Sequence, residues 1–244
     1  MRILLTNDDG IEAEGINALY KELSKKHDCT VIAPNGERSA SSHSLSIQRD
    51  LYYSKTPLGY AISGTPADCV KVGILSLLET PVDLVVSGIN NGTNLGTDVM
   101  YSGTVSAAFE AAYLGVRGIA ISLAKHNAPI EYYDEAAKFL SERIEKFAAL
   151  NLSAQTILNI NYPVKVPYIG MRFTASGINL YDDTFISGGS EGSLRLKGKQ
   201  ISHDLNGEDC DVELIKKGYA TVTPLKIDQN DYDTLDYLKG LKNF

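Results

Sequence analysis

Two adjacent carboxylates, Asp8 and Asp9, are the first residues in this sequence whose type and spacing suggest chemistry. They follow a short apolar run, and Gly10 permits a turn that brings both side chains into one site. Crowded carboxylates repel each other unless a cation neutralises them, and oxygen ligands suit a hard cation such as Mg²⁺ or Mn²⁺. For this pair alone a second interpretation stays open, in which one aspartate caps a following helix and the other is solvated.

A polar loop at residues 35–44 is the second candidate. It carries serines on both sides of one histidine: Ser39, Ser41, Ser42, His43 and Ser44. A serine hydroxyl could bind a metal ion or a phosphate, although loops of this composition also occur without any such role. Among His27, His43, His126 and His203, only His43 falls in a predicted site loop. An imidazole can act as a general acid, so His43 either participates directly in chemistry or serves the structure of the loop.

The third candidate is a glycine- and asparagine-rich loop at residues 88–103. Its glycines at positions 88, 92 and 96 do not follow the order of a dinucleotide-binding fingerprint. At its end, Ser102, Gly103 and Thr104 precede a predicted helix, so backbone amides and two hydroxyls would lie at a helix N-terminus. That arrangement suits a phosphate, and it is also compatible with Thr104 acting only as the cap of its helix.

These three clusters are predicted to follow the ends of strands. Strands and helices alternate along the first part of the chain, with strands at residues 2–6, 30–33, 82–87, 118–122 and 157–161 and helices at residues 12–26, 65–78, 104–114 and 131–147. Further strands are expected at residues 45–53 and 60–63. The alternation predicts a doubly wound, mostly parallel, Rossmann-like α/β sheet, in which ligands bind at the carboxyl ends of the strands.

Beyond residue 163 the pattern changes. We predict a catalytic α/β domain at residues 1–163 and a C-terminal antiparallel β appendage at residues 164–244. Strands are expected at residues 168–175 and 217–223, with a flexible Gly/Ser/Asp-rich connection between them and no helix before about residue 230.

The appendage is expected to serve oligomerisation. Strands without an evident core of their own leave unpaired edges and a one-sided apolar surface, and a second copy of the chain can cover both. The expected apolar contributors are Tyr219, Val222 and Leu225.

Composition excludes several classes of protein. The chain has 244 residues and a net charge of −7, without the basic excess of a general polyanion binder, so duplex nucleic acid is not an expected partner. Its cysteines lack CxxC or Cys/His pairing, which predicts reduced thiols and no structural zinc site. No apolar stretch of about 18 residues and no signal peptide is recognisable, so we expect no membrane association and a soluble, cytoplasmic protein.

Four segments, in this order and spacing, closely resemble the SurE (survival protein E) family of 5′/3′-nucleotidases. They read MRILLTNDDG, APNGERSASSHSLS, GTPADCV and VSGINNGTNLGTDVMYSGTVSAAFEA, and the resemblance covers residues 1–125. Later in the chain, LNINYP and GYATVTPL are similar to further landmarks of the family. The chain departs from the family pattern at residues 176–207, which leaves substrate preference and the detail of subunit contacts open.

The resemblance implies a metal-dependent phosphomonoesterase that hydrolyses nucleoside 5′- and 3′-monophosphates, with an exopolyphosphatase side activity to be tested. It implies one divalent metal ion per subunit, Mg²⁺ or Mn²⁺, held by Asp8, Asp9, Ser39 and Asn90. Other residues match positions that line the phosphate site in the family: Asn94, Ser102, Gly103 and Thr104. The resemblance further implies a homodimer or homotetramer that exchanges C-terminal segments.

The expected mechanism is in-line attack of a metal-activated water on the phosphomonoester, with Asp8 or Asp9 accepting its proton. One alternative makes Asp8 a nucleophile that forms an aspartyl-phosphate, and the adjacent rather than alternating spacing of the two acids counts against it. A second alternative is a nucleotide-binding module without catalysis, which would not need paired acids beside its phosphate site.

Overall fold

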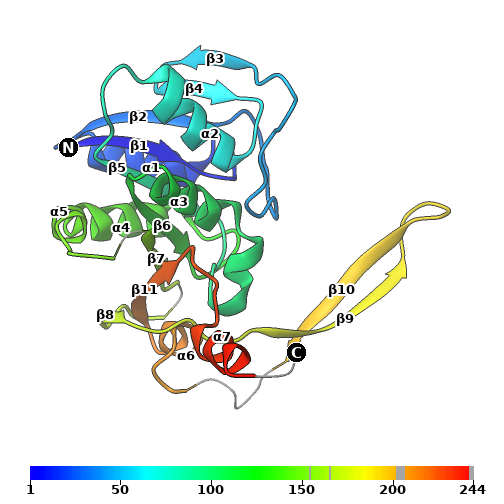
Figure 1. The fold of residues 1–244 in the computed structure, drawn as a ribbon. Coiled ribbons are helices and arrows are strands. Elements are labelled where there is room, and N and C mark those ends of the chain that lie inside the picture. The colour runs from blue at the N-terminus through cyan, green and yellow to red at the C-terminus, as the bar shows by residue number, and fades with distance from the viewer. Residues whose placement is uncertain (154, 165, 202–206, 242–244) are drawn as a thin grey trace.

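The structure, a computed structural model, describes residues 1–153, 155–164, 166–201 and 207–241, and its centre is a nine-stranded sheet (Figure 1). Within these residues the strand order is β3-β4-β2-β1-β5-β6-β7-β11-β8. The strands are β1 (Arg2–Thr6), β2 (Asp28–Pro34), β3 (Tyr53–Thr56), β4 (Gly59–Ile62), β5 (Leu84–Asn90), β6 (Arg117–Leu123), β7 (Thr156–Tyr162), β8 (Gly170–Phe173) and β11 (Tyr219–Lys226). Parallel pairing from β4 through β7 confirms the predicted mostly parallel, doubly wound sheet.

Helices cover both faces of this sheet, because successive side chains of a central strand point to opposite sides. The helices are α1 (Glu14–Leu23), α2 (Pro66–Val72), α3 (Gly103–Tyr113), α4 (Ile130–Ser141), α5 (Ile144–Ala148), α6 (Asp211–Lys216) and α7 (Tyr232–Lys239). In β1, Ile3 and Leu5 pack with α1, α4 and α5, whereas Leu4 packs with α2 and α3. A strand such as β5, buried on both faces, therefore needs the continuous apolar run that its sequence shows.

Two expected elements are different in the structure. Residues 45–52 form no strand, and β3 begins only at Tyr53. Part of this segment is held by a side chain instead of a strand partner, since Asp68 Oδ1 accepts the Ser46 N–H at 3.0 Å. The helix expected at residues 131–147 is divided into α4 and α5, and Arg143 has a non-helical φ of −123° at the break.

The expected C-terminal strands extend the main sheet. β11 pairs antiparallel with β7 and parallel with β8. Val222 is fully buried in the main core, and Leu225 packs with the hydrophobic cluster beneath α3. The expectation that Val222 faces a second copy is therefore wrong, and the short helix α6 before β11 is an element that the sequence pattern missed. The domain boundary at residue 163 stays a prediction.

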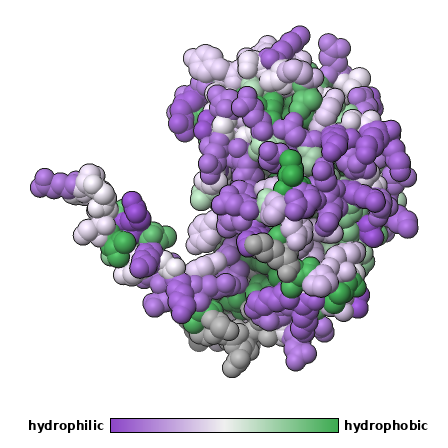
Figure 2. All heavy atoms as spheres, turned by 180° about the vertical axis from the view of Figure 1, so that it is seen from behind, coloured by the Kyte–Doolittle hydropathy of each residue, from purple (hydrophilic) through white to green (hydrophobic). Residues whose placement is uncertain are grey.

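A separate antiparallel ribbon forms from β9 (Leu180–Ser187) and β10 (Leu194–Ile201), and it projects from the body of the protein (Figure 1). The expectation of a flexible connection here is wrong, because the two strands pair along their whole length. Phe185 and Leu196 lie directly opposite each other and are 65% and 57% exposed. Figure 2 shows apolar side chains on this projecting ribbon, outside the core of the molecule.

None of the described helices is long and apolar enough to cross a bilayer. The cysteines are free thiols, as predicted. Burial raises the pKa of Cys29 to about 11 and holds that of Cys69 well above its ordinary value, which keeps both thiols protonated.

Candidate active site

The candidate site is built at the carboxyl ends of β1 and β5, which are neighbours in the sheet. Thr6 at the end of β1 pairs with Ser87 in β5. Directly after β1, Asn7 Oδ1 accepts the Gly10 N–H at 3.2 Å and Asn7 Nδ2 donates to the Gly10 carbonyl at 2.8 Å. Gly10 has a φ of 103°, a conformation that favours glycine. The chain therefore turns here, as predicted, and keeps both aspartates at this edge of the sheet.

Asp8 is buried against the N-terminus of α3. It is 5% exposed, its carboxylate accepts a hydrogen bond from the Thr104 hydroxyl, and its carbonyl accepts the Arg38 N–H at 2.7 Å. Burial raises the pKa of Asp8 to about 6; the Thr104 hydrogen bond opposes this rise and the charge of Asp9 adds to it. The ionised form of Asp8 would therefore gain from a cation at this position.

Asp9 faces a cavity of about 250 Å³ that is rich in carboxylates. The other lining residues are Ala13, Glu14, Gly15, Glu37, Asn91 and Tyr133. The Asn91 N–H donates to Asp9 Oδ2 at 3.0 Å. Burial raises the pKa of Asp9, the Asn91 hydrogen bond and the charge of His126 oppose this rise, and the charge of Glu37 adds to it. The carboxylates that line this cavity favour binding of a cation or of sugar hydroxyls over binding of an anionic group.

The N-terminus of α3 supplies hydrogen-bond donors beside Asp8. Ser102 caps this helix, since its Oγ accepts the Val105 N–H at 3.0 Å. A Cβ atom built on Gly103 would lie 2.7 Å from Ser41 Oγ and 3.1 Å from Asp8 Oδ2, so glycine allows both groups to approach. Ser41 Oγ is buried and has no hydrogen-bond partner within the described residues. A phosphate bound here would meet backbone N–H groups of the helix and this unpaired hydroxyl.

Ser39 and Asn90 complete the predicted metal-ligand set. Ser39 Oγ donates to Glu37 Oε1 at 2.7 Å, which leaves its lone pairs for a cation. Asn90 ends β5, and its Nδ2 donates to the Gly92 carbonyl at 3.0 Å, so its Oδ1 is the atom that remains for a cation. In the part of the chain that the structure describes, no three His, Cys, Asp or Glu side chains form a metal-binding group.

A cation at this edge would therefore depend on neutral oxygens together with the aspartate pair. The donor chemistry fits Mg²⁺ or Mn²⁺, because two carboxylates, a hydroxyl and an amide oxygen are hard ligands. The burial of Asp8 beside Asp9 fits a cation as well, since a positive charge would favour ionisation of both acids. The assignment of the four ligands stays a prediction.

Asn94, another predicted phosphate ligand, belongs to a buried hydrogen-bond network. It is 6% exposed, and its Nδ2 donates to Ser122 Oγ at 2.8 Å. Its carbonyl accepts hydrogen bonds from Asn159 and Asn161 at 2.7 and 2.9 Å. These hydrogen bonds connect Asn94 to the carboxyl ends of β6 and β7. Its assignment to the phosphate site stays a prediction.

His43 contacts α3 instead of the aspartate pair. Its Nε2 lies 2.9 Å from Glu110 Oε2, which favours the structural interpretation of this histidine. His126 is the imidazole whose charge acts on Asp9, and a Cβ atom built on Gly92 would lie 2.3 Å from its Cε1. His203 lies outside the described residues.

Three residues of the site were not predicted individually: Glu37, Ser41 and Asn91. Each is close in sequence to a predicted ligand, so the loops themselves were recognisable. Ser39 and Ser41 are both loop serines, and only the family resemblance separates them in the sequence. Which hydroxyl reaches the start of α3 depends on how the loop folds back, and that contact joins residues distant in sequence.

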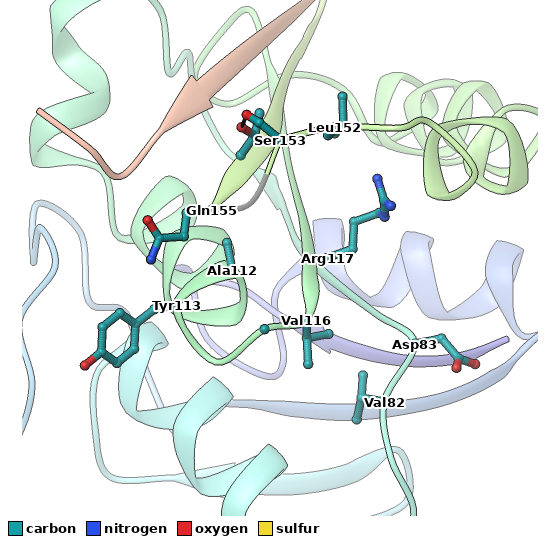
Figure 3. Close-up of a pocket in the computed structure, with 11 residues that line it drawn as sticks. Val82, Asp83, Ala112, Tyr113, Val116, Arg117, Leu152, Ser153 and Gln155 are labelled. Atoms are coloured by element: carbon teal, nitrogen blue, oxygen red, sulfur yellow. Dashed lines mark hydrogen bonds between the residues drawn. The ribbon is translucent and has the colours of Figure 1, made fainter.

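A second cavity, of about 510 Å³, lies near the amino ends of the central strands, away from the carboxyl ends that carry Asp8 (Figure 3). Asp83 and Arg117, near the beginnings of β5 and β6, lie on its lining. Asp83 Oδ2 accepts the Arg2 N–H at 2.7 Å, and an Arg117 guanidinium N–H donates to the Leu150 carbonyl at 2.7 Å. Both charged side chains are already engaged in hydrogen bonds with backbone groups. Ligands of parallel sheets bind at the carboxyl ends of the strands, so we place the active site at Asp8.

Comparisons with known proteins show which proteins this chain is similar to. A family model described as Survival protein SurE matches residues 3–183. A 5′-nucleotidase SurE from Pelotomaculum thermopropionicum is 41% identical over 251 residues, which cover 99% of this chain and 95% of that protein. A 5′-nucleotidase SurE from Syntrophus aciditrophicus is 44% identical over 252 residues, with coverage of 99% and 94%. The crystal structure of the SurE protein from Aquifex aeolicus matches with a TM-score of 0.85 at 34% identity and covers 98% of each chain.

Proposed function

The chain belongs to the SurE family, and from that premise we propose that it is a metal-dependent 5′-nucleotidase that hydrolyses nucleoside monophosphates to a nucleoside and phosphate. The observation that carries the proposal is the placement of Asp8. This carboxylate is buried, interacts with the charge of the adjacent Asp9, and lies close to Gly103 at the N-terminus of α3. A cation site and a phosphate site would therefore both adjoin Asp8, which suits metal-assisted phosphoryl transfer because the cation must lie close to the phosphoryl group.

The chain's own residues would bind and orient the substrate. Backbone N–H groups at the start of α3 and the Ser41 hydroxyl would hold the phosphate oxygens. The Thr104 hydroxyl, which donates to Asp8, orients that carboxylate. A divalent cation, when bound by Asp8, Asp9, Ser39 and Asn90, supplies charge that polarises the phosphoryl group and lowers the pKa of a water molecule.

The proton of the attacking water would go to Asp8 or Asp9. One oxygen of each carboxylate is already held, since Asp8 Oδ1 accepts from Thr104 and Asp9 Oδ2 accepts from Asn91. The second oxygen of each side chain is available for a proton or a cation.

The cavity beside Asp9 supports a preference for monophosphates. Glu14 and Glu37 on its wall would repel a second phosphate, while they could accept hydrogen bonds from ribose hydroxyls. We therefore propose nucleoside 5′-monophosphates as the main substrates, 3′-monophosphates as additional ones, and short polyphosphate as a poor side substrate.

Phosphate release from adenosine monophosphate, with Mn²⁺ and with EDTA, tests this function. We expect release with Mn²⁺ and loss of release with EDTA. Binding of the nucleotide without release would favour the non-catalytic module. Trapping of an acid-stable, hydroxylamine-sensitive phosphoenzyme would favour the aspartyl-phosphate mechanism over attack by water.

We also propose that the protein works as a homodimer or homotetramer in the cytoplasm. Exposed apolar side chains on the β9–β10 ribbon support assembly, because a projecting ribbon has no core of its own to bury them. Chromatography coupled to light scattering measures the assembly state directly.

A further inference from the structure

The phosphate-binding end of α3 directly follows a 3₁₀ helix, η2 (Gly96–Tyr101). Ser102 ends η2 and caps α3, so it belongs to both elements. Any shift of η2 would therefore move Ser102, and with it the backbone N–H groups that follow. The contacts that fix η2 come from parts of the chain far away in sequence.

Asp211 of α6 holds the beginning of η2. Its side chain is fully buried, its Oδ2 accepts the Gly96 N–H at 3.0 Å, and its Oδ1 accepts the Gly177 N–H at 2.7 Å. Gly96 has a φ of 54°, and a Cβ atom there would lie 3.0 Å from the Gly177 carbonyl oxygen. The start of η2 is thus packed tightly against the segment that leads into the ribbon.

The root of the β9–β10 ribbon holds the middle of η2. Asp98 Oδ2 accepts the Tyr181 hydroxyl at 2.6 Å and Asn179 Nδ2 at 2.9 Å. Thr97 Oγ1 donates to the Asn179 carbonyl at 2.7 Å and accepts the Asn179 N–H at 3.1 Å. Bonds to a charged acceptor are the stronger kind, so the Asp98 carboxylate is the main polar anchor between the ribbon and η2.

The far end of η2 holds the serine loop of the site. The Ser42 N–H donates to the Tyr101 carbonyl at 3.1 Å, and Ser42 Oγ donates to the Met100 carbonyl at 2.7 Å. Ser41 precedes Ser42 and carries the buried, unpaired hydroxyl beside Gly103. η2 therefore connects the ribbon root to both proposed phosphate-binding groups, the start of α3 and the loop.

We propose that Asp98 is a positioning residue, through which Tyr181 and Asn179 at the ribbon root set the geometry of the phosphate-binding end of α3. This rests on the proposed function, because it assumes that phosphate binds there. The ribbon strands are exposed throughout and pack into no core, so their order depends on few contacts. A ribbon ordered by those contacts would preorganise the site, and by reciprocity phosphate binding would order the ribbon root.

Equilibrium titration of the full chain with inorganic phosphate, with and without Mn²⁺, tests the proposal without depending on turnover. Tyr181→Phe removes only the hydroxyl that Asp98 accepts, and we expect phosphate to bind about 2- to 30-fold more weakly. Mn²⁺ affinity should stay unchanged, and KM for adenosine monophosphate should rise while kcat changes little. The matched control is Tyr219→Phe, whose hydroxyl accepts a 3.4 Å hydrogen bond from Arg172 in the edge strand β8.

A purely structural role predicts a different set of results. Unchanged phosphate affinity in Tyr181→Phe, with a lower midpoint of thermal unfolding, would overturn the proposal. Asn179→Ala removes the other donor to Asp98, and its phosphate affinity is measured in the same way. If Asn179→Ala does not fold, the result with Tyr181→Phe decides alone. Asp98→Asn keeps an acceptor oxygen and should bind phosphate better than Asp98→Ala; equal losses in the two would count against positioning.

The outcomes also separate this proposal from the proposed function. If the native chain binds phosphate and releases none from adenosine monophosphate, the proposed function fails and the titration still tests Asp98. If the native chain binds no phosphate, the positioning proposal fails, because it assumes that phosphate binds at the start of α3.

Discussion

His43 in the serine loop and Glu110 in α3 are 67 positions apart in sequence, and His43 Nε2 lies 2.9 Å from Glu110 Oε2. Lys71 Nζ of α2 lies 2.6 Å from the other carboxylate oxygen. Burial works to raise the pKa of Glu110, but its bonds with His43 and Lys71 outweigh burial and hold that pKa below its ordinary value. One buried carboxylate therefore connects the serine loop, α2 and α3, the helix whose N-terminus forms the proposed phosphate site.

Glu110→Gln should destabilise the protein. The amide is nearly isosteric but cannot pair with Lys71 as a charge, and we expect the free energy of unfolding to fall by about 1–3 kcal/mol in urea titrations. The matched control is Glu213→Gln, which removes an exposed pair with Lys216 at 2.7 Å and should cost less than about 1 kcal/mol. Equal losses in the two variants would argue against a special role for the buried carboxylate.

Asp8→Asn and Asp9→Asn should each remove most of the nucleotidase activity. Each change takes one negative charge from the proposed cation site at little steric cost, and we expect a loss of about 10²-fold or more in kcat/KM. Mn²⁺ should raise the thermal midpoint of the native protein and do so less in either variant, because it binds only the folded site.

The control for the two aspartate variants is Asp134→Asn, since Asp134 is exposed and forms a surface ion pair with Lys21. Ser39→Ala and Asn90→Ala should weaken Mn²⁺ binding more mildly, because neutral ligands contribute less charge. Normal turnover in both aspartate variants at saturating metal would reject the metal-site assignment.

Gly103→Ala should impair phosphate binding while leaving the fold largely intact. The new Cβ would lie 2.7 Å from Ser41 Oγ and 3.0 Å from Asp8 Cβ, so these groups must move away from the helix start. We expect inhibition by inorganic phosphate to weaken about 10-fold or more. Gly189→Ala is the control, because a Cβ atom there meets nothing within 4 Å. Ser41→Gly in the Gly103→Ala background should not restore phosphate inhibition fully, since it also removes the unpaired hydroxyl.

The parallel core of this fold could be predicted from sequence because its strands are buried on both faces. The run from Val82 to Ser87 is nearly all apolar, and such a run is typical of a central strand in a parallel sheet. The ribbon gives no such signal. Its side chains are exposed on both faces, so no burial pattern marks Leu180–Ser187 or Leu194–Ile201 as strands, and glycine, serine and aspartate in the region suggest a loop instead.

The site could be predicted only in part for a related reason. Asp8 and Asp9 are adjacent in sequence, and the strand before them fixes the edge at which they lie. The partners of His43 and Asp98, by contrast, lie on distant segments, and single-sequence patterns carry no information about such pairs. Ser41 is one of several similar serines, and its closeness to Gly103 depends on the path of the loop.

His27 should make the protein less stable in mild acid. It is buried, neither ring nitrogen has a hydrogen-bond partner within the described residues, and burial together with the N-terminal charge lowers its pKa from 6.5. As the pH falls below about 6.5, the unfolded chain binds a proton before the folded chain does, so the free energy of unfolding decreases. Above that pH the residue is neutral in both states and contributes no pH dependence.

Urea unfolding of the native protein and of His27→Leu between pH 7.5 and pH 5.5 measures this effect. The loss of stability should begin as the pH falls below about 6.5, the ordinary pKa of a histidine. We expect a smaller loss of stability in His27→Leu. Identical pH dependence in the native protein and His27→Leu would remove His27 as the source.

The apolar face of the β9–β10 ribbon should control assembly. Phe185 and Leu196 are directly opposite on one face, and Leu194, 71% exposed, extends that face toward the tip. Side chains that are two positions apart share a face of a ribbon, so Ile186 lies on the other face, opposite Arg195. Substituting Phe185→Ser and Leu196→Ser together should convert the assembled protein to a smaller species at micromolar concentration in light scattering. Ile186→Ser, the same kind of change on the opposite face, should leave the assembly state unchanged. A full-length native chain that is a stable, active monomer under these conditions would refute the assembly proposal, and the exposed apolar face would then need a different partner.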